Sequence, residues 1–321
     1  MKLATLNNAT PDGQLVVVSD DGQRFVAATG IAATLQNAIE NWAECEPRLR
    51  DLAAQLASGE GDALGDRRIA APLPRAWQWL DGSAFDSHGD LMQIVFNLAP
   101  NPKGRPLMYQ GMSHQFLGAN DDVALPSEED GIDFEGEFGV ITDFVQMGIS
   151  ADDAMAHIKL VVQINDWSLR AIAPVEMKTG FGWVQAKPAC SAAPFAITPD
   201  ALGEHWRDGR VCLPLSVDWN GERFGNADGA AMAYGFHELI AHAARTRSLC
   251  AGTIIGSGTV SNENFREVGS SCIAERRGIE IVDTGAPKTA FMAFGDTVRM
   301  EATLPDASLL FGAIEQKVVR S

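Results

Sequence analysis

The sequence lacks the segments that carry a chain into or across a membrane. It contains no run of about 18 apolar residues, so a transmembrane helix is not expected. Residues 1–8 include no apolar stretch of the kind that a signal peptide needs. The five cysteines are scattered without CxxC spacing, which is typical of reduced thiols rather than of a disulfide framework. These features predict a cytoplasmic protein.

Basic residues are also scarce. There are 25 Lys and Arg against 42 Asp and Glu, which gives a formal net charge of −17. A chain this acidic is repelled by nucleic-acid phosphates and by anionic membrane surfaces, so neither is an expected partner. The same surplus of carboxylates suits an enzyme that holds a divalent cation.

The sequence has no internal repeats and no low-complexity segment, and its first part has a texture of its own. Residues 14–19 and 24–28 are short β-like runs around an Asp-Asp-Gly turn, which predicts a hairpin. Thr34 is a candidate N-cap for a helix that we expect to break at Pro47. The turn-rich acidic stretch 59–66 is a candidate linker.

We therefore expect a small N-terminal α/β domain over residues 1–66 and a larger domain over residues 67–321. The larger part is β-rich, with many Gly and Pro turns. Helices are expected after Ser150 and over residues 236–249. Short strands with few helices predict an α+β, curled mixed β structure rather than alternating βαβ units. The strand candidates are residues 136–142, 159–164, 213–219, 278–282 and 297–302.

Three carboxylates in apolar, strand-like surroundings carry the chemistry. Glu135 and Glu137 are two residues apart, so on a strand they point to one face with Cα atoms about 7 Å apart. Asp166 ends an apolar run, and Arg170 follows four residues later. A Glu-x-Glu pair can also be the solvent face of a half-buried sheet. Facing carboxylates on an apolar strand otherwise need a cation, and oxygen ligands suit Mg²⁺, Ca²⁺ or Mn²⁺.

These residues resemble the fumarylacetoacetate hydrolase family. The resemblance rests on four motifs in the family's order: Glu-x-Glu, Asn-Asp-Trp-Ser-x-Arg, Lys187 in Gln-Ala-Lys, and Gly-Ser-Gly-Thr at 256–259. It covers about residues 72–318 and implies the family's mixed β-sheet roll behind a small N-terminal domain. It also implies metal-dependent hydrolysis of a carbon–carbon bond in a β-diketo acid, with fumarylacetoacetate and tyrosine catabolism as the first expectation. A homodimer is expected as well.

The resemblance further implies a role for each residue. His88, seven residues after Asp81, is expected to be the general base, and Glu275 to orient its ring. Arg170 and Lys187 are expected to face the leaving enolate. The remaining implied residues bind metal (Asp81, Glu135, Glu137, Asp166) or substrate (Tyr109, Thr259).

Two positions depart from the animal-type members of the family. Ala173 stands where they carry Gln, and residues 188–191 replace their Ser-Phe-Gly-Thr; Gln185 and Ser191 are candidates to supply the missing polar contacts. The alternatives are therefore an acylpyruvate hydrolase, a 2-keto acid decarboxylase or hydratase of the same superfamily, and a metal-binding protein without activity.

Overall fold

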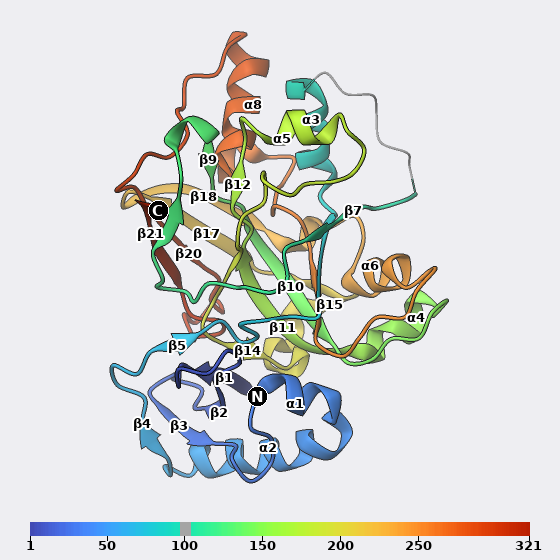
Figure 1. The fold of residues 1–321 in the computed structure, drawn as a ribbon, viewed down its shortest axis with the longest axis vertical. Coiled ribbons are helices and arrows are strands. Elements are labelled where there is room, and N and C mark those ends of the chain that lie inside the picture. The colour runs from blue at the N-terminus through green and yellow to red at the C-terminus, as the bar shows by residue number, and fades with distance from the viewer. Residues whose placement is uncertain (97–103) are drawn as a thin grey trace.

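The computed structural model describes residues 1–96 and 104–321 of the chain. Strands dominate its middle, and helices lie at both ends of the long axis (Figure 1). A 12-stranded mixed sheet and a five-stranded sheet contain most of the strands. The predicted β-rich α+β fold is confirmed.

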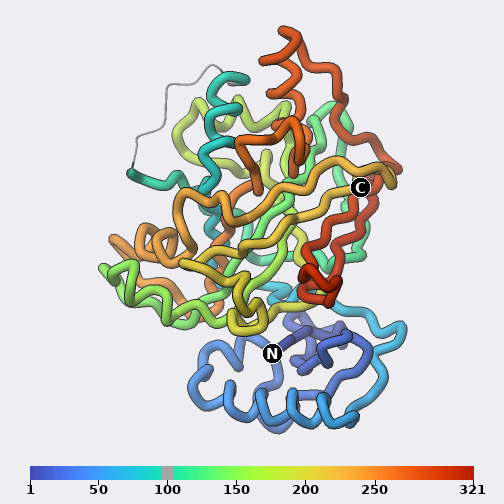
Figure 2. Tube along the Cα trace, turned by 180° about the vertical axis from the view of Figure 1, so that it is seen from behind, coloured from blue at the N-terminus to red at the C-terminus, as the bar shows by residue number. Residues whose placement is uncertain are grey.

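The N-terminal segment forms a meander of three antiparallel strands covered by two helices, at the lower end of the molecule in Figures 1 and 2. Thr34 caps α1 as predicted, because its hydroxyl accepts the N–H of Asn37. The expected break at Pro47 is wrong. The first helix, α1 (Leu35–Glu40), ends before Asn41, and α2 (Trp42–Ala57) then runs through Pro47. Pro47 removes only one hydrogen bond there, and the buried apolar side chains of α2 hold the helix in place.

The N-terminal strands continue into the large sheet. β1 (Lys2–Leu6) pairs with β2 (Gln14–Val18) on one side and with β14 (Ala196–Ile197) on the other, and β14 pairs with β11 (Ile158–Asn165). The expected linker adds a short edge strand, since β4 pairs with β3. The division at residues 66 and 67 remains our proposal.

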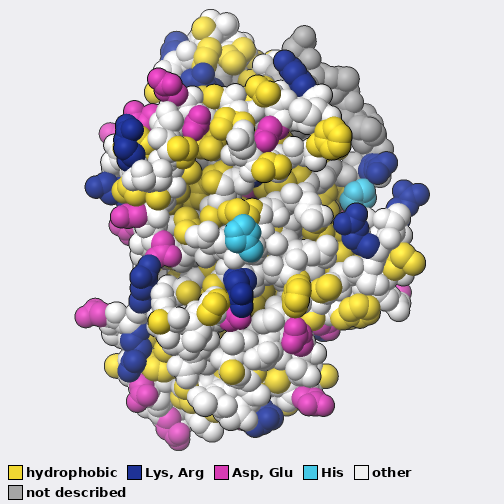
Figure 3. All heavy atoms as spheres, viewed as in Figure 1, with side chains coloured by type: hydrophobic (Ala, Val, Ile, Leu, Met, Phe, Trp, Pro, Cys, Tyr) yellow, Lys and Arg dark blue, Asp and Glu magenta, His cyan; other side chains and the backbone are white. Residues whose placement is uncertain are grey.

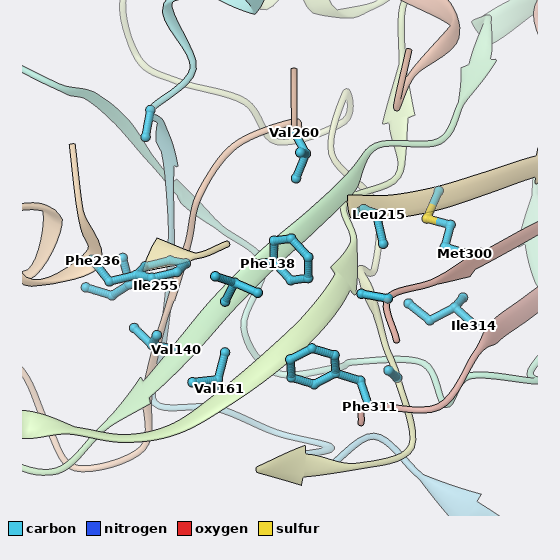
Figure 4. Close-up of a cluster of buried hydrophobic side chains, with 14 of the residues drawn as sticks. Phe138, Val140, Val161, Leu215, Phe236, Ile255, Val260, Met300, Phe311 and Ile314 are labelled. Atoms are coloured by element: carbon cyan, nitrogen blue, oxygen red, sulfur yellow. The ribbon is translucent and has the colours of Figure 1, made fainter. Parts of the chain in front are cut away.

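The main core lies between the two sheets. Phe138 of β10 (Gly136–Thr142) lies toward Leu215 of the five-stranded sheet, whereas Val140 lies beside Ile255 and Val161 (Figure 4). These residues are fully buried. The period of two along β10 places Glu137 on the opposite face from Phe138. Packing of Phe138 in the core therefore fixes the position of β10, whose opposite face carries Glu137.

Two helices at the upper end of Figure 1, α3 and α8, pack against each other. A Cβ on Gly278 would lie 2.9 Å from Val95 Cγ2, so only glycine permits this close approach. The predicted strand over residues 278–282 is therefore wrong, because these residues belong to α8. Side-chain caps at its start and packing against α3 override the β propensity of Ile and Val.

The helix predicted over residues 236–249 is shorter than expected. It ends at Ala243, and Leu249 instead exchanges backbone hydrogen bonds with Val145. The helix expected after Ser150 is present, and the Ser150 hydroxyl accepts the N–H of Asp153. The strands predicted at 136–142, 159–164, 213–219 and 297–302 are present within a residue or so at each end.

The bounds of the elements are as follows. The large sheet contains β1 (Lys2–Leu6), β2 (Gln14–Val18), β3 (Arg24–Ala27), β4 (Asp62–Ala63), β5 (Ile69–Ala70), β6 (Gln78–Ser83), β7 (Leu107–Gly111), β10 (Gly136–Thr142), β11 (Ile158–Asn165), β13 (Ser191–Ala192), β14 (Ala196–Ile197) and β19 (Thr253–Gly256). The five-stranded sheet contains β8 (Val123–Leu125), β17 (Pro214–Trp219), β18 (Glu222–Asp228), β20 (Thr297–Glu301) and β21 (Ile314–Arg320). Two short pairs are β9 (Ile132–Asp133) with β12 (Ser168–Leu169) and β15 (Trp206–Arg207) with β16 (Arg210–Val211). The α-helices are α1 (Leu35–Glu40), α2 (Trp42–Ala57), α3 (Asp86–Phe96), α4 (Ala151–Ala154), α5 (Ala173–Met177), α6 (Phe236–Ala243), α7 (Phe265–Val268) and α8 (Ile273–Thr284).

None of the helices in the described part of the chain has the length and apolar character that crossing a membrane requires. On the face shown in Figure 3, acidic and basic side chains are interspersed, with exposed hydrophobic side chains between them.

Candidate active site

Neighbouring strands of the large sheet bring three carboxylates together. Asp81 lies on β6, Glu137 on β10, and Asp166 directly after the end of β11. β19 lies between β6 and β10, so Asp81 and Glu137 approach each other across it. One carboxylate oxygen from each of the three residues lies within 4.8 Å of the others. The structure thus assembles three of the four predicted metal ligands.

The chemistry of this carboxylate cluster fits a hard cation. Both carboxylate oxygens of Glu137 are buried and have no hydrogen-bond partner among the described residues. Burial raises the pKa of Glu137 well above its usual range, and the charges of Asp81 and Asp166 raise it further. Burial, followed by the charge of Asp166, has the same effect on the pKa of Asp81. Carboxylates that repel one another in the interior call for a divalent ion among them, and oxygen donors favour Mg²⁺, Mn²⁺ or Ca²⁺.

The Gly-Ser-Gly-Thr motif makes room for Asp81. A Cβ on Gly256 would lie 2.3 Å from Asp81 Oδ1 and 2.4 Å from the Trp79 ring. Gly258 has a positive φ of 76°, and its N–H donates to Asp81 Oδ1 at 3.0 Å. The motif is therefore a turn that follows β19 and orients a proposed metal ligand.

Glu135, the fourth predicted ligand, is surrounded by cations and hydroxyls. Arg170 forms an ion pair with Glu135 Oε1, and Lys187 Nζ lies 3.1 Å from Oε2. The hydroxyls of Ser168 and Thr259 donate to the same carboxylate at 2.8 and 3.2 Å. Burial alone would raise the pKa of Glu135, but the charges of Arg170 and Lys187 outweigh it and hold the pKa well below its usual range. Glu135 therefore anchors both predicted catalytic cations.

Asp166 joins the carboxylate cluster to Lys187. Its Oδ2 lies 2.5 Å from Lys187 Nζ, and the Tyr109 hydroxyl donates to both of its oxygens, at 3.0 and 2.8 Å. The thiol of Cys190 donates to Oδ1 at 2.9 Å. Burial would lower the pKa of Lys187, but Asp166 and Glu135 outweigh burial and raise it, so the side chain stays charged.

Asp133 is a buried residue that the sequence motifs did not single out. Its Oδ2 lies 2.8 Å from Arg170 Nε, and its two oxygens accept the N–H groups of Ile273 and Ala274 at 2.7 and 2.9 Å. One carboxylate thus positions both Arg170 and the start of α8, which carries Glu275. The one indication of its role in the sequence is that Asp133 lies two residues before Glu135.

His88 and Glu275 lie on the two packed helices α3 and α8. A ring nitrogen of His88 and a carboxylate oxygen of Glu275 lie within 4.8 Å of each other. Burial lowers the pKa of His88 to about 4, so the imidazole is neutral at pH 7 and can accept a proton. Burial raises the pKa of Glu275 to about 7, and its Oε1 accepts a hydrogen bond from Ser261.

A cavity of about 270 Å³ opens onto these groups. Seven of the ten predicted site residues line the cavity, and Glu137, Asp166 and Glu275 are not part of its lining in the described chain. Gln185 and Ser191 do not belong to the lining in the described chain, and Ser191 accepts the indole N–H of Trp167 instead. The idea that either replaces the missing polar contacts is therefore wrong. The rest of the wall is mostly apolar: Met92, Leu107, Met108, Ala173, Met177 and Trp183.

Two family models match the chain. The model for the fumarylacetoacetate (FAA) hydrolase C-terminal domain matches residues 78–319. The model for fumarylacetoacetase N-terminal domain 2 matches residues 1–75. Together they account for the sheet that carries the site and for the N-terminal meander.

Among curated proteins, a 2,4-didehydro-3-deoxy-L-rhamnonate hydrolase of Sphingomonas sp. (strain SKA58) is 27% identical over 157 residues, which cover 48% of this chain and 52% of that enzyme. A mitochondrial oxaloacetate tautomerase of Rattus norvegicus is 26% identical over 157 residues, 48% of each protein. The matches therefore span about half the length of these curated relatives.

Among solved structures, maleylpyruvate hydrolase of Sphingobium sp. SYK-6, in complex with a manganese(II) ion and pyruvate, has a TM-score of 0.69 at 17% identity, over 100% of both chains. This similarity establishes a common fold.

Proposed function

Because the chain belongs to the fumarylacetoacetate hydrolase family, we propose that it is a divalent-metal-dependent hydrolase that cleaves a carbon–carbon bond in a β-diketo acid. The observation that carries this proposal is the placement of a buried carboxylate cluster, in which Glu137 has no hydrogen-bond partner among the described residues, and of a neutral histidine at one cavity. Fumarylacetoacetate, cleaved to fumarate and acetoacetate, is the first substrate to test, and an acylpyruvate is the second.

Asp81, Glu137 and Asp166 would hold the cation, with Glu135 as a fourth ligand through the oxygen that Lys187 and Thr259 now contact. When bound, the cation would polarise the two carbonyl oxygens of the diketo unit.

His88 would take a proton from the attacking water, because its ring is neutral and lines the cavity. Glu275 would stabilise the imidazolium that results. Arg170 and Lys187 keep fixed positive charges at the cavity wall, where they would meet the enolate that leaves. The apolar part of the wall would exclude water from the rest of the substrate.

The test is product analysis by NMR with a panel of diketo acids and added Mg²⁺, Mn²⁺ or Ca²⁺. Two carboxylic or keto-acid products without CO₂ support hydrolysis. Release of CO₂ would favour the decarboxylase alternative, and keto–enol exchange without cleavage would favour the reaction named for the rat relative. Asp90→Asn, an exposed change on α3, is the matched control for Glu137→Gln, and only the latter should abolish turnover.

A further inference from the structure

A second cluster of metal-binding groups lies beside the first. His88 of α3, the α8 cap Cys272 and Glu275 in the first turn of α8 each offer one donor atom, and these atoms lie within 4.8 Å of one another. The set comprises a nitrogen, a sulfur and an oxygen, in contrast to the oxygen-only carboxylate cluster.

Two atoms of this cluster have unmet hydrogen-bonding capacity. Glu275 is 0% exposed, and its Oε2 has no hydrogen-bond partner in the described chain, although Ser261 satisfies Oε1. His88 Nδ1 is also buried and partnerless among these residues. The proposed His88–Glu275 dyad gives Cys272 no chemical part, and its sulfur serves only to accept the N–H of Glu275 at 3.3 Å.

We propose that His88, Cys272 and Glu275 bind a soft divalent ion, Zn²⁺ in the first place, and that this ion inhibits the enzyme. Zinc prefers imidazole and thiolate over carboxylate oxygens alone, whereas Mg²⁺ prefers the reverse. The cluster of His88, Cys272 and Glu275 is therefore expected to bind Zn²⁺, and the carboxylate cluster is expected to bind Mg²⁺.

The geometry allows this with small movements. Zinc binds such ligands at about 2.0–2.3 Å in a tetrahedron, so donor atoms end about 3.5 Å apart. Atoms now within 4.8 Å must close by about 1.3 Å at most, which side-chain rotation on α3 and α8 can supply. The Cys272 thiol loses its proton to solvent as the Zn–S bond forms, and a water fills the fourth position from the cavity that His88 lines.

Zinc should inhibit the enzyme because one of its ligands, His88, is the proposed general base. Zinc on the ring nitrogen beside Glu275 leaves the single proton of the neutral ring on the other nitrogen, so neither nitrogen can take a proton from water, and turnover stops while the carboxylate cluster keeps its own ion. The inhibitory effect rests on the proposed function, whereas the binding site itself does not.

The experiment uses full-length protein saturated with Mg²⁺. Co²⁺ is added as a spectroscopic substitute for zinc, and Zn²⁺ binding is measured by calorimetry in parallel. The wild type should show the near-ultraviolet charge-transfer band of a cobalt–thiolate bond and one zinc site that excess Mg²⁺ does not displace. Zinc should also suppress turnover.

Cys272→Ser is the decisive variant, because a serine hydroxyl can keep the cap on α8. It should keep turnover, lose the cobalt–thiolate band and weaken zinc inhibition at least about 10-fold, since the thiolate is the softest donor. Cys190→Ser is the matched control, because its thiol contacts Asp166 of the carboxylate cluster. It should retain the band and the zinc site.

Loss of the band in Cys190→Ser but not in Cys272→Ser would place the soft ion in the carboxylate cluster and overturn the proposal. Absence of a Mg²⁺-resistant zinc site in the wild type would also overturn it. If Cys272→Ser fails to fold, Cys272→Ala provides the same readouts. Cys272-dependent zinc binding in a protein that cleaves no diketo acid would leave the site standing and refute only the proposed function.

Discussion

Removing the charge of Glu137 should stabilise the metal-free protein at neutral pH, although it should abolish metal binding. Two carboxylate oxygens within 4.8 Å of each other repel by at least about 3.5 kcal/mol at an effective dielectric constant of about 20. The native state can escape this repulsion by keeping a proton on Glu137, whose pKa burial and its acidic neighbours raise above the ordinary value of 4.5. Holding a proton on Glu137 at pH 7 costs at most about 3.4 kcal/mol relative to the unfolded chain. The repulsion therefore cannot destabilise the folded state by more than this amount.

The stability of the metal-free wild type should fall as the pH rises above about 4.5. A carboxyl group with a raised pKa in the folded state costs nothing below about pH 4.5, where the unfolded chain also holds the proton. As the pH rises from there, the unfolded chain loses its proton, the native state does not, and stability falls. Glu137→Gln removes this slope, so it should gain about 1–3 kcal/mol at pH 7 and nothing near pH 4.5.

The assay is chemical denaturation in EDTA at both pH values, repeated with saturating Mg²⁺. Glu222→Gln, an exposed change on β18, is the matched control and should differ from the wild type at neither pH. Added Mg²⁺ should stabilise the wild type and leave Glu137→Gln unchanged. A variant that is less stable than the wild type in EDTA at pH 7, or that Mg²⁺ still stabilises, would refute the reasoning.

Four further predictions concern the base, its pH dependence, the support of Arg170 and the assembly. His88→Ala should lower kcat by about 10²–10⁴-fold with metal affinity intact, and Glu275→Gln should lower kcat by less. The double variant should be little slower than His88→Ala, because the two residues act as a unit. Full activity in His88→Ala would instead favour the lyase alternative. In the wild type, kcat/KM should fall in part as the pH drops through about 7, where Glu275 takes up a proton, and again through about 4, the value to which burial lowers the pKa of His88; complete loss of activity already near pH 6.5 would contradict this. Asp133→Asn should lower the free energy of unfolding by about 3 kcal/mol, since it leaves the buried Arg170 with one carboxylate partner; a loss below about 1 kcal/mol would argue against this support. Light scattering should give about twice 34.4 kDa, and a monomer at micromolar concentration would exclude the expected homodimer.

Strands that are buried on both faces were predictable from the sequence, because 136–142 and 159–164 are short, largely apolar runs bounded by polar or turn residues. The helix over 273–284 was not, because its start depends on Asp133, which is about 140 residues away in the chain. The same is true of Pro47, whose local effect is outweighed by the packing of α2.

Within the site, motif order was enough to bring seven predicted residues to one cavity. It could not show that Glu135 contacts two cations whereas Glu137 contacts none, since both are the same residue type on one short segment. That difference is set by the three-dimensional approach of Arg170 and Lys187.

The central claim is that water attacks a carbonyl of a β-diketo acid at the carboxylate cluster, and labelling with H₂¹⁸O tests it most directly. Turnover in labelled water, with short reaction times and a check that recovered substrate is unlabelled, should place one ¹⁸O in the carboxylate of the acyl product. Glu137→Gln should give no labelled product. Carbon–carbon cleavage that leaves this carboxylate unlabelled, or labelled product from Glu137→Gln at the wild-type rate, would contradict the account.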